Sequence, residues 1–247
     1  RWVVRNRAWT PWYLVRYWRF FWLKVRNPHI ITEGFVFIGR RAELYGPLGA
    51  AVRELIDAAI RTEVDDDTIR TATTQISDIA AGLRARQIDG AFGVRYNASG
   101  TGMAWGNAVV GLANGVAPPI TLHYPPTGGT RAEFNLGAPY EGPPGCVHGG
   151  ICMMVLDALL GSAAASDETA AYTGTITVRF LRPTMLFTPL TASAEVTERS
   201  GRKKIVRGSI ADEHGDTVVA EGVFILPRET NARPLTSVDG STRRAPG

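Results

Sequence analysis

A glycine-rich stretch ahead of a long apolar run carries the residues best suited to chemistry on a carbonyl group. It reads Gly142-Pro143-Pro144-Gly145-Cys146-Val147-His148-Gly149-Gly150. Glycines at the start of a helix leave its first backbone N–H groups uncovered, and these groups together with the helix dipole favour a developing negative oxygen. The stretch therefore predicts an oxyanion site built from backbone.

A second candidate is Asp157, the only charged residue among the apolar positions of residues 148–165. A carboxylate is costly to bury unless a partner or a reaction uses it. A catalytic carboxylate is one interpretation. The alternative is an aspartate on the one exposed stripe of the helix.

Other chemically capable residues form weaker patterns. His29, His123 and His214 are scattered along the chain, and Ser99-Gly100-Thr101-Gly102 lacks the lysine of a phosphate loop. Cys146 lies two residues from His148, but no third group is evident to orient such a pair, so we favour a small loop residue.

The two cysteines, Cys146 and Cys152, are too few for a disulfide framework, and their spacing fits no usual zinc pattern. A reducing, cytoplasmic compartment is the default expectation. The acidic triplet Asp65-Asp66-Asp67 precedes a helix-like segment, where a helix cap is far more common than a metal site.

The elements that would position the candidate residues follow from hydrophobic periodicity. Residues 148–165 are apolar almost all round and predict a buried helix. Strand-like runs occupy residues 120–124, 130–136, 171–182, 189–199, 203–212 and 216–226. One buried helix against an antiparallel sheet predicts an α+β fold.

The first and the last of the four strand-like runs after the helix differ in their patterns. In residues 171–182, Ile176, Val178 and Phe180 alternate with polar residues, which predicts one face toward the core. In residues 216–226 both faces are apolar, which predicts a strand covered on both sides. Turn sequences at Ser200-Gly201 and His214-Gly215-Asp216 indicate hairpins.

The chain divides by composition into four segments: residues 1–46, a basic Trp- and Arg-rich segment; residues 47–90, a helical hairpin; residues 91–227, the main domain; and residues 228–247, a tail without periodicity. Apolar residues recur at helical spacing in both parts of the hairpin. Residues 90–119 are loop-like, and a loop of that length predicts either a lid or poor order.

The first segment has a net charge of +7 and holds five of the six tryptophans, whereas the remainder has a net charge of −3. The mildly acidic remainder argues against a nucleic-acid-binding surface. Interleaved Trp and Arg suit a membrane interface. The alternatives are packing of these aromatics on the domain or on a partner subunit, or a segment foreign to the domain that follows. The sequence NPHIITEGFVFIG resembles the lead-in to bacterial hexapeptide-repeat acyltransferases, but no hexapeptide repeat follows it.

The glycine-rich stretch and its helix, APYEGPPGCVHGGICMMVLDALLG in the main domain, followed by TGTITVRFLRPT, resemble the hotdog-fold acyl-CoA thioesterases of the PaaI-like group over about residues 91–227. The resemblance implies a hotdog fold, in which a curled antiparallel sheet wraps one long helix. It also implies a homodimer or a dimer of dimers with active sites at the subunit interface.

The resemblance also implies roles for individual residues. The backbone N–H of Gly149 would polarise the thioester carbonyl, and His148 would orient that loop or the carbonyl. Asp157 of the other subunit would act as general base or nucleophile, with Thr173 helping to hold the water. Gly150 and Gly174 would contact substrate. Gly142 stands where phenylacetate-type members carry asparagine, so we expect the variant that uses aspartate and threonine.

The basic run Arg202-Lys203-Lys204, with Arg207, is a candidate for binding the phosphates of coenzyme A, or else an ordinary solvated hairpin. We therefore expect an acyl-CoA thioesterase that needs no metal and no organic cofactor. The expected location is cytoplasmic, with peripheral membrane contact through residues 1–46. The alternatives are a non-catalytic acyl-CoA-binding or regulatory hotdog protein, and a membrane-attached partner in lipid metabolism.

Overall fold

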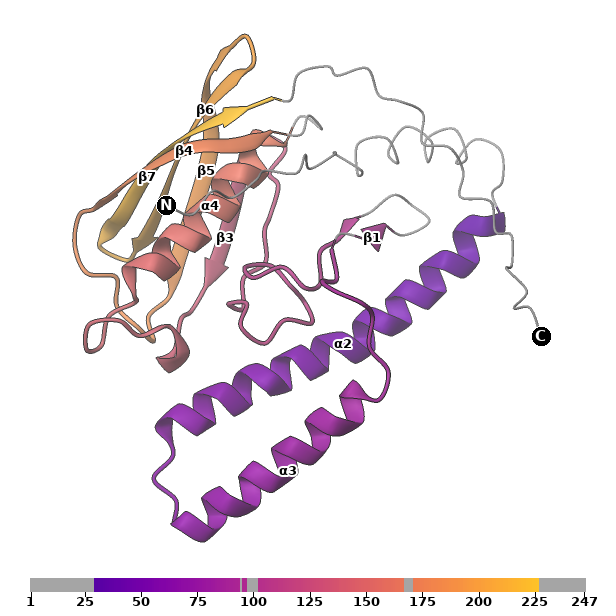
Figure 1. Cartoon of the computed structure of the whole chain (residues 1–247). Coiled ribbons are helices and arrows are strands. Elements are labelled where there is room, and N and C mark those ends of the chain that lie inside the picture. The colour runs from indigo at the N-terminus through magenta and orange to yellow at the C-terminus, as the bar shows by residue number, and fades with distance from the viewer. Residues whose placement is uncertain (1–28, 94, 97–101, 167–170, 227–247) are drawn as a thin grey trace, which may run out of the picture.

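The computed structural model of the chain describes residues 29–93, 95–96, 102–166 and 171–226 (Figure 1). Five antiparallel strands form the main sheet in the order β3-β5-β6-β7-β4. Their bounds are Thr130–Phe134 for β3, Tyr172–Phe180 for β4, Leu190–Ser200 for β5, Lys203–Asp212 for β6 and Gly215–Ile225 for β7. Glycines at positive φ, Gly201 and Gly215, make the turns of the β5–β6 and β6–β7 hairpins, as predicted.

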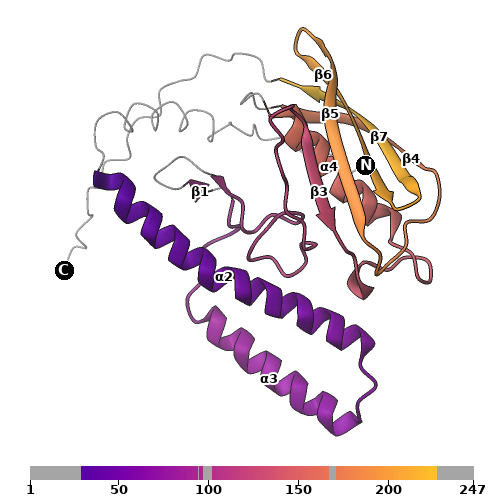
Figure 2. The same ribbon diagram turned by 180° about the vertical axis from the view of Figure 1, so that it is seen from behind.

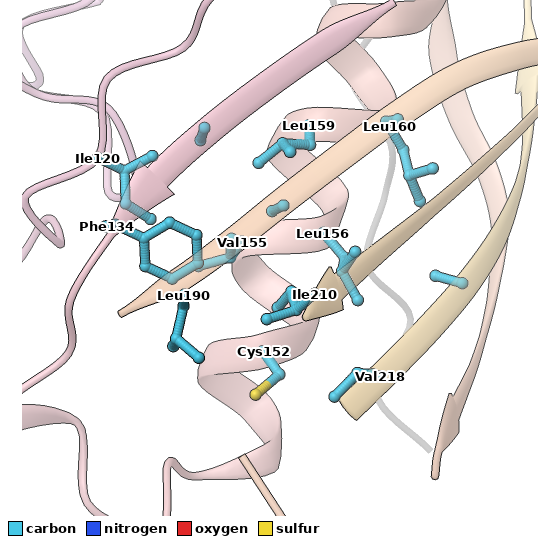
Figure 3. Packing of buried hydrophobic residues seen from close by; sticks show 14 of the residues in the cluster. Ile120, Phe134, Cys152, Val155, Leu156, Leu159, Leu160, Leu190, Ile210 and Val218 are labelled. Atoms are coloured by element: carbon cyan, nitrogen blue, oxygen red, sulfur yellow. The ribbon is translucent and has the colours of Figure 1, made fainter. Parts of the chain in front are cut away.

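Helix α4, Gly149–Ala164, crosses one face of this sheet and forms the core with it. Val155, Leu156 and Leu159 are fully buried. They pack with Leu190, Ile210 and Val218 of three different strands (Figure 3). The α+β expectation of one helix held in an antiparallel sheet is therefore confirmed, and the arrangement is the hotdog fold.

The burial of α4 is one-sided. Its sheet-facing residues are buried, but Met153 keeps 45% of its surface exposed and Asp157 is exposed as well. The sequence predicted a helix buried all round. The difference arises because the sheet covers a single side of the helix, so the remaining apolar side chains need another surface to bury them.

The strand predicted at residues 120–124 is absent from the structure except for one bridge. Only His123 remains paired there, in a two-way backbone contact with Arg131 at 2.8 and 2.9 Å. Pro118-Pro119 and Pro125-Pro126 flank this segment, and proline has no N–H for a strand ladder. The segment is therefore a single bridge.

The edge position of β4 changes its predicted burial. Ile176 and Val178 pack against the core, as expected, but are only half-buried, and Phe180 is 54% exposed. In β7, one face is buried and the residues of the other, Val219 and Val223, are only half-buried. Both strands thus expose apolar surface that the sheet alone does not cover.

Helix α2 runs from His29 to Arg61 and contains Pro47 in its interior. The change of composition at Gly46-Pro47 is therefore not a break in secondary structure. Small residues at this point let a loop approach closely: Gly49 is buried, and a Cβ there would lie 2.3 Å from the carbonyl oxygen of Leu112. Packing of α2 on this loop compensates for the hydrogen bond that Pro47 removes.

The loop that packs on α2 belongs to the segment between the helices and the sheet. It follows a short strand pair, β1 Arg95–Tyr96 and β2 Gly102–Met103. The ring of Trp105 lies 5.5 Å from Tyr45 of α2 and 5.9 Å from Phe92. Aromatic contacts thus hold this loop against α2.

Helix α3, Asp66–Arg84, follows α2 with its N-terminus capped by Asp65, whose carboxylate accepts from the Thr68 N–H at 3.0 Å. The prediction of a cap in the acidic triplet is confirmed. α3 contains no buried residue. α2 and α3 lie on the β3 side of the domain, whereas β4 forms the opposite edge of the sheet (Figures 1 and 2).

Among the described residues, none of the helices is both long and apolar enough to span a bilayer. The tryptophan-rich start of the chain, residues 1–28, and the tail from residue 227 lie outside the described residues.

Candidate active site

The glycine-rich stretch forms a tight turn that is pinned on both sides before α4 begins. The Gly142 N–H donates to the Cys146 carbonyl at 2.9 Å, and the Val147 N–H donates to the Thr184 carbonyl at 2.8 Å. The next N–H, that of His148, donates to the Tyr140 carbonyl at 2.9 Å. These bonds fix the start of α4 before any ligand arrives, which suits a preorganised oxyanion site.

His148 is the N-cap of α4, and its Nδ1 accepts a hydrogen bond from the Gly150 N–H at 2.9 Å. A neutral imidazole that accepts at Nδ1 carries its proton on Nε2, so the outer edge of the ring is a donor. The cap uses the Gly150 N–H, whereas within the described chain the N–H of Gly149 donates to no protein acceptor. Two donors, Gly149 N–H and His148 Nε2–H, thus remain for a carbonyl oxygen.

A side chain at either of two glycines beside His148 would crowd its neighbours. A Cβ on Gly149 would lie 3.2 Å from Cζ of Phe180, the last residue of β4. A Cβ on Gly142 would lie 2.7 Å from the Cα of His148. The second contact explains why this chain has no asparagine at position 142.

Asp157 lies two turns further along α4, on its exposed stripe, where the Thr173 hydroxyl donates to Asp157 Oδ1 at 3.1 Å. Thr173 reaches this carboxylate because a β-bulge interrupts β4 between Thr173 and Thr175. Gly174 is the extra residue of the bulge, and a Cβ there would lie 3.1 Å from the Val223 carbonyl oxygen. The structure thus brings together Asp157 and Thr173, the pair expected to hold water.

The two halves of the expected site are far apart within one chain. Gly149 and Asp157 are eight residues apart on a continuous helix. At a rise of 1.5 Å per residue, about 12 Å separate them along the helix axis. Reacting groups must come within about 3–3.5 Å of the same carbonyl, so one chain cannot bring both groups to one thioester.

The basic run near the β5–β6 turn lies beside the C-terminal end of α4. Lys203 is exposed, and the Arg202 guanidinium donates to the Leu226 carbonyl at 2.7 and 2.9 Å. Lys204 differs from the expectation: it is 2% exposed, and its Nζ donates to the Ala164 carbonyl at 2.6 Å. Its ammonium group donates to a backbone carbonyl at the C-terminal end of α4, where positive charge is favourable. It is therefore not available to a phosphate. Arg207 pairs with Glu221 at 2.8 Å.

The other candidates do not gather at the site. His123 lies in its bridge and His214 in the β6–β7 turn, and His29 begins α2. Cys146 is half-buried in the turn. Burial raises the pKa of the Cys152 thiol, which is weakly bonded to Thr184 at 3.9 Å. Within the described ranges, no group of three His, Cys, Asp or Glu side chains is placed to hold a metal ion.

Some contacts of the site left no trace in the sequence. Phe180, 31 residues further along the chain, covers Gly149, and Tyr140 holds His148 through its backbone carbonyl. The first contact depends on which strand meets the start of α4, and the second is made by a backbone carbonyl, which carries no residue preference, so periodicity and spacing could not reveal them.

The comparisons with known proteins agree with this fold. The family model of the thioesterase superfamily matches residues 144–219, which include the turn before α4, α4 itself and most of the sheet. A crystal structure of a thioesterase superfamily protein is 32% identical, with a TM-score of 0.66, over 73% of this chain and 90% of that one. The chain therefore belongs to the thioesterase superfamily.

Two curated relatives match shorter parts. Acyl-coenzyme A thioesterase THEM4 of Mus musculus is 27% identical over 107 residues, 43% of this chain and 46% of that protein. The protein named "Probable acetyltransferase Rv3034c" of Mycobacterium tuberculosis is 60% identical over 45 residues, 18% of this chain and 15% of that protein. The chain thus spans less than half the length of either relative. The second match is to an acetyltransferase, the enzyme class that the NPHIITEGFVFIG sequence resembles.

Proposed function

We propose that the chain hydrolyses acyl-CoA thioesters to the free acid and coenzyme A, at a site that two copies of the chain share. The observation that carries this proposal is the hydrogen bond from Thr173 to Asp157 on the exposed stripe of α4. A carboxylate held by a hydroxyl, in a helix that begins with uncommitted donors, is suited to activating water beside a polarised carbonyl.

The reaction follows from the chemistry of these groups. The Gly149 N–H and the Nε2–H of His148 bind the thioester oxygen. Asp157 takes a proton from water as the hydroxide adds to the carbonyl carbon, and negative charge collects on the oxygen. When the carbonyl re-forms, the C–S bond breaks and coenzyme A leaves as a thiolate, which accepts the proton. Direct attack by the Asp157 carboxylate is the alternative and would give an anhydride that water then opens.

The separation of about 12 Å between Gly149 and Asp157 supports a shared site. In an antiparallel pair of α4 helices around a two-fold axis, Asp157 of one protomer approaches Gly149 of the partner subunit. Two surfaces favour such a pair: the exposed stripe of α4 around Met153, and the outer edge of β4, which pairs with β7 on its other side. We therefore propose a homodimer, with a dimer of dimers as a higher assembly.

The basic residues suit the coenzyme A end of the substrate. Lys203 pairs with Ile225, which pairs with Tyr172, the residue before Thr173. Lys203 and Tyr172 are therefore two strand spacings apart, which is a distance of about 10 Å. Arg202 and Lys203 thus lie at the same end of the sheet as Thr173, with Lys203 on the face away from α4, and we assign phosphate binding to these two residues without Lys204.

The remaining expectations depend on this activity. Hydrolysis of acyl-CoA belongs to lipid metabolism, and the free thiols suit a reducing cytoplasmic compartment. Peripheral membrane contact stays a proposal for residues 1–46, based on their charge and tryptophans.

A hydrolysis assay tests the proposed function. The full chain is incubated with acyl-CoAs from acetyl to palmitoyl, together with benzoyl-CoA, and the released thiol is measured with a chromogenic thiol reagent. We expect turnover with at least one of them that disappears in Asp157→Asn. Binding of acyl-CoA without turnover would contradict the enzyme and favour the non-catalytic alternative.

A further inference from the structure

A cavity of about 580 Å³ lies between α2 and the start of α4. Its apolar walls include Ala50 and Ile56 of α2, Pro139 and Tyr140 before the glycine-rich turn, and Ile151 and Met154 of α4. This volume lies within the range of small-molecule sites, which are mostly apolar with a few polar groups.

The cavity adjoins the oxyanion donors. Ile151 is two residues after Gly149, and Met154 is about 7.5 Å along the helix from Gly149. On the other side, Tyr140 lines the cavity while its backbone carbonyl holds the His148 N–H at 2.9 Å. At about 100° per residue, Ile151 and Met154 project from the side of α4 away from Gly149, so the acyl group of a thioester bound at Gly149 would reach the cavity around the N-terminal end of the helix, where Tyr140 contacts His148.

Two of the three charged side chains that line the cavity are engaged by the protein, and the third, Glu54, is exposed to solvent. Asp57 pairs with Arg61 at 3.0 Å, and Arg53 donates to the Asn114 carbonyl at 3.4 Å. Burial raises the pKa of the Tyr140 hydroxyl, which stays neutral at physiological pH. The cavity therefore presents aliphatic carbon more than free charge to a ligand.

The geometry points to this cavity as the binding site for the alkyl chain of the substrate, with α2 as its outer wall. This inference rests on the proposed function and adds the substrate class: straight-chain acyl groups of medium or greater length. A short group such as acetyl would leave most of the cavity empty. Because α2 lies outside the matched residues 144–219, chain-length preference comes from the extension of this chain.

A matched pair of tryptophan variants on α2 tests the inference. Ile56→Trp fills the cavity, whereas Ile60→Trp, one turn later, changes a residue that is 55% exposed and does not line it. We expect Ile56→Trp to lower kcat/KM for decanoyl-CoA by at least about tenfold, since each buried methylene contributes about fourfold. Acetyl-CoA should change less than about twofold, and Ile60→Trp should behave like the wild type.

A binding measurement separates this inference from the proposed activity. Calorimetry compares coenzyme A with decanoyl-CoA on the full-length Asp157→Asn protein, with and without Ile56→Trp. A gain in affinity from the acyl chain that Ile56→Trp removes supports the cavity even if no thioester is hydrolysed. If the acyl chain gives no gain, or if Ile56→Trp and Ile60→Trp give the same chain-length profile, the inference is wrong, whether or not hydrolysis occurs. Circular dichroism confirms that both variants fold.

Discussion

The hydroxyl of Thr173 donates a hydrogen bond to the carboxylate of Asp157 over 3.1 Å, and this contact joins the start of β4 to the middle of α4. The carboxylate is exposed in the single chain, so water reaches it, and the hydroxyl limits its rotation. A side chain held in this way is ready to act on a substrate that a second protomer positions.

Replacing the carboxylate removes the base and preserves the shape. For Asp157→Asn we expect kcat to fall about 10²–10⁴-fold with little change in substrate affinity. Thr173→Val should lower kcat less, because the carboxylate remains. The measurement is steady-state hydrolysis together with calorimetric binding. Asp89→Asn, which changes an exposed carboxylate away from the site, is the control. Turnover near the wild-type rate in Asp157→Asn would refute this role.

Two variants distinguish the role of His148 as the N-cap of α4 from its proposed role as a hydrogen-bond donor to the substrate. His148→Ala loses both, so we expect the free energy of unfolding to fall by about 1 kcal/mol and kcat to fall as well. Asparagine is also a good N-cap, so His148→Asn should restore stability without restoring the rate, because it has no group in the position of Nε2–H. Urea denaturation and steady-state kinetics measure the two effects. If His148→Asn restored kcat as well as stability, His148 would act only as a structural cap.

A shared site predicts complementation between two inactive proteins. Gly149→Val places a side chain against Phe180 and disturbs the oxyanion half, whereas Asp157→Asn disturbs the other half. In a hybrid dimer one of the two sites is intact, so an equal mixture refolded together should regain about a quarter of the wild-type activity. Each variant alone, refolded in the same way, is the control. If both fold and dimerise but their mixture stays inactive, each site belongs to a single chain.

Neighbouring lysines on β6 should respond in opposite ways. Lys204→Met leaves the Ala164 carbonyl without its buried partner, so the free energy of unfolding should fall by about 1–3 kcal/mol. Lys203→Met should leave stability unchanged and raise KM for acyl-CoA, and the difference from the wild type should shrink at high salt. Thermal denaturation and KM at two salt concentrations measure this. Equal KM values for Lys203→Met and the wild type at low salt would remove Lys203 from the phosphate site.

The loop after β4 depends on pH through one ion pair. Both oxygens of Asp212, whose side chain is 8% exposed, bond to the Arg182 guanidinium, and this contact lowers the pKa of Asp212 from 3.8 to about 2. A carboxyl with a lowered pKa in the folded state stabilises the protein above its unfolded-state value and loses this contribution as the pH falls.

The difference in the free energy of unfolding between the wild type and Asp212→Asn should therefore be constant above about pH 5 and should disappear between pH 4 and pH 2. Denaturation by urea at a series of pH values measures this difference. A difference that does not change over this range would mean that the ion pair contributes nothing measurable to stability.

The sequence by itself determined the elements whose periodicity is strong. The apolar run at residues 148–165 became α4 within one residue at each end, and the alternating runs from residue 171 onward became four strands joined by the predicted turns. Asp65 capped α3 as expected, because capping depends on local geometry alone. The glycine-rich turn also began α4, since glycine, proline and histidine act there through local backbone contacts.

The tertiary structure decided what depends on distant neighbours. Pro47 lies inside α2 because packing of Gly49 on the loop around Leu112 outweighs a local signal to end the helix. Lys204 resembles its exposed neighbour Lys203 in the sequence, but the alternation of β6 turns it inward, where the Ala164 carbonyl at the end of α4 accepts its hydrogen bond. The contact between Asp157 and Thr173 joins two residues that are 16 apart in the sequence, and the bulge at Gly174 sets its direction. Local preferences act within a few residues, whereas these placements depend on which surfaces meet once the sheet has closed around its helix.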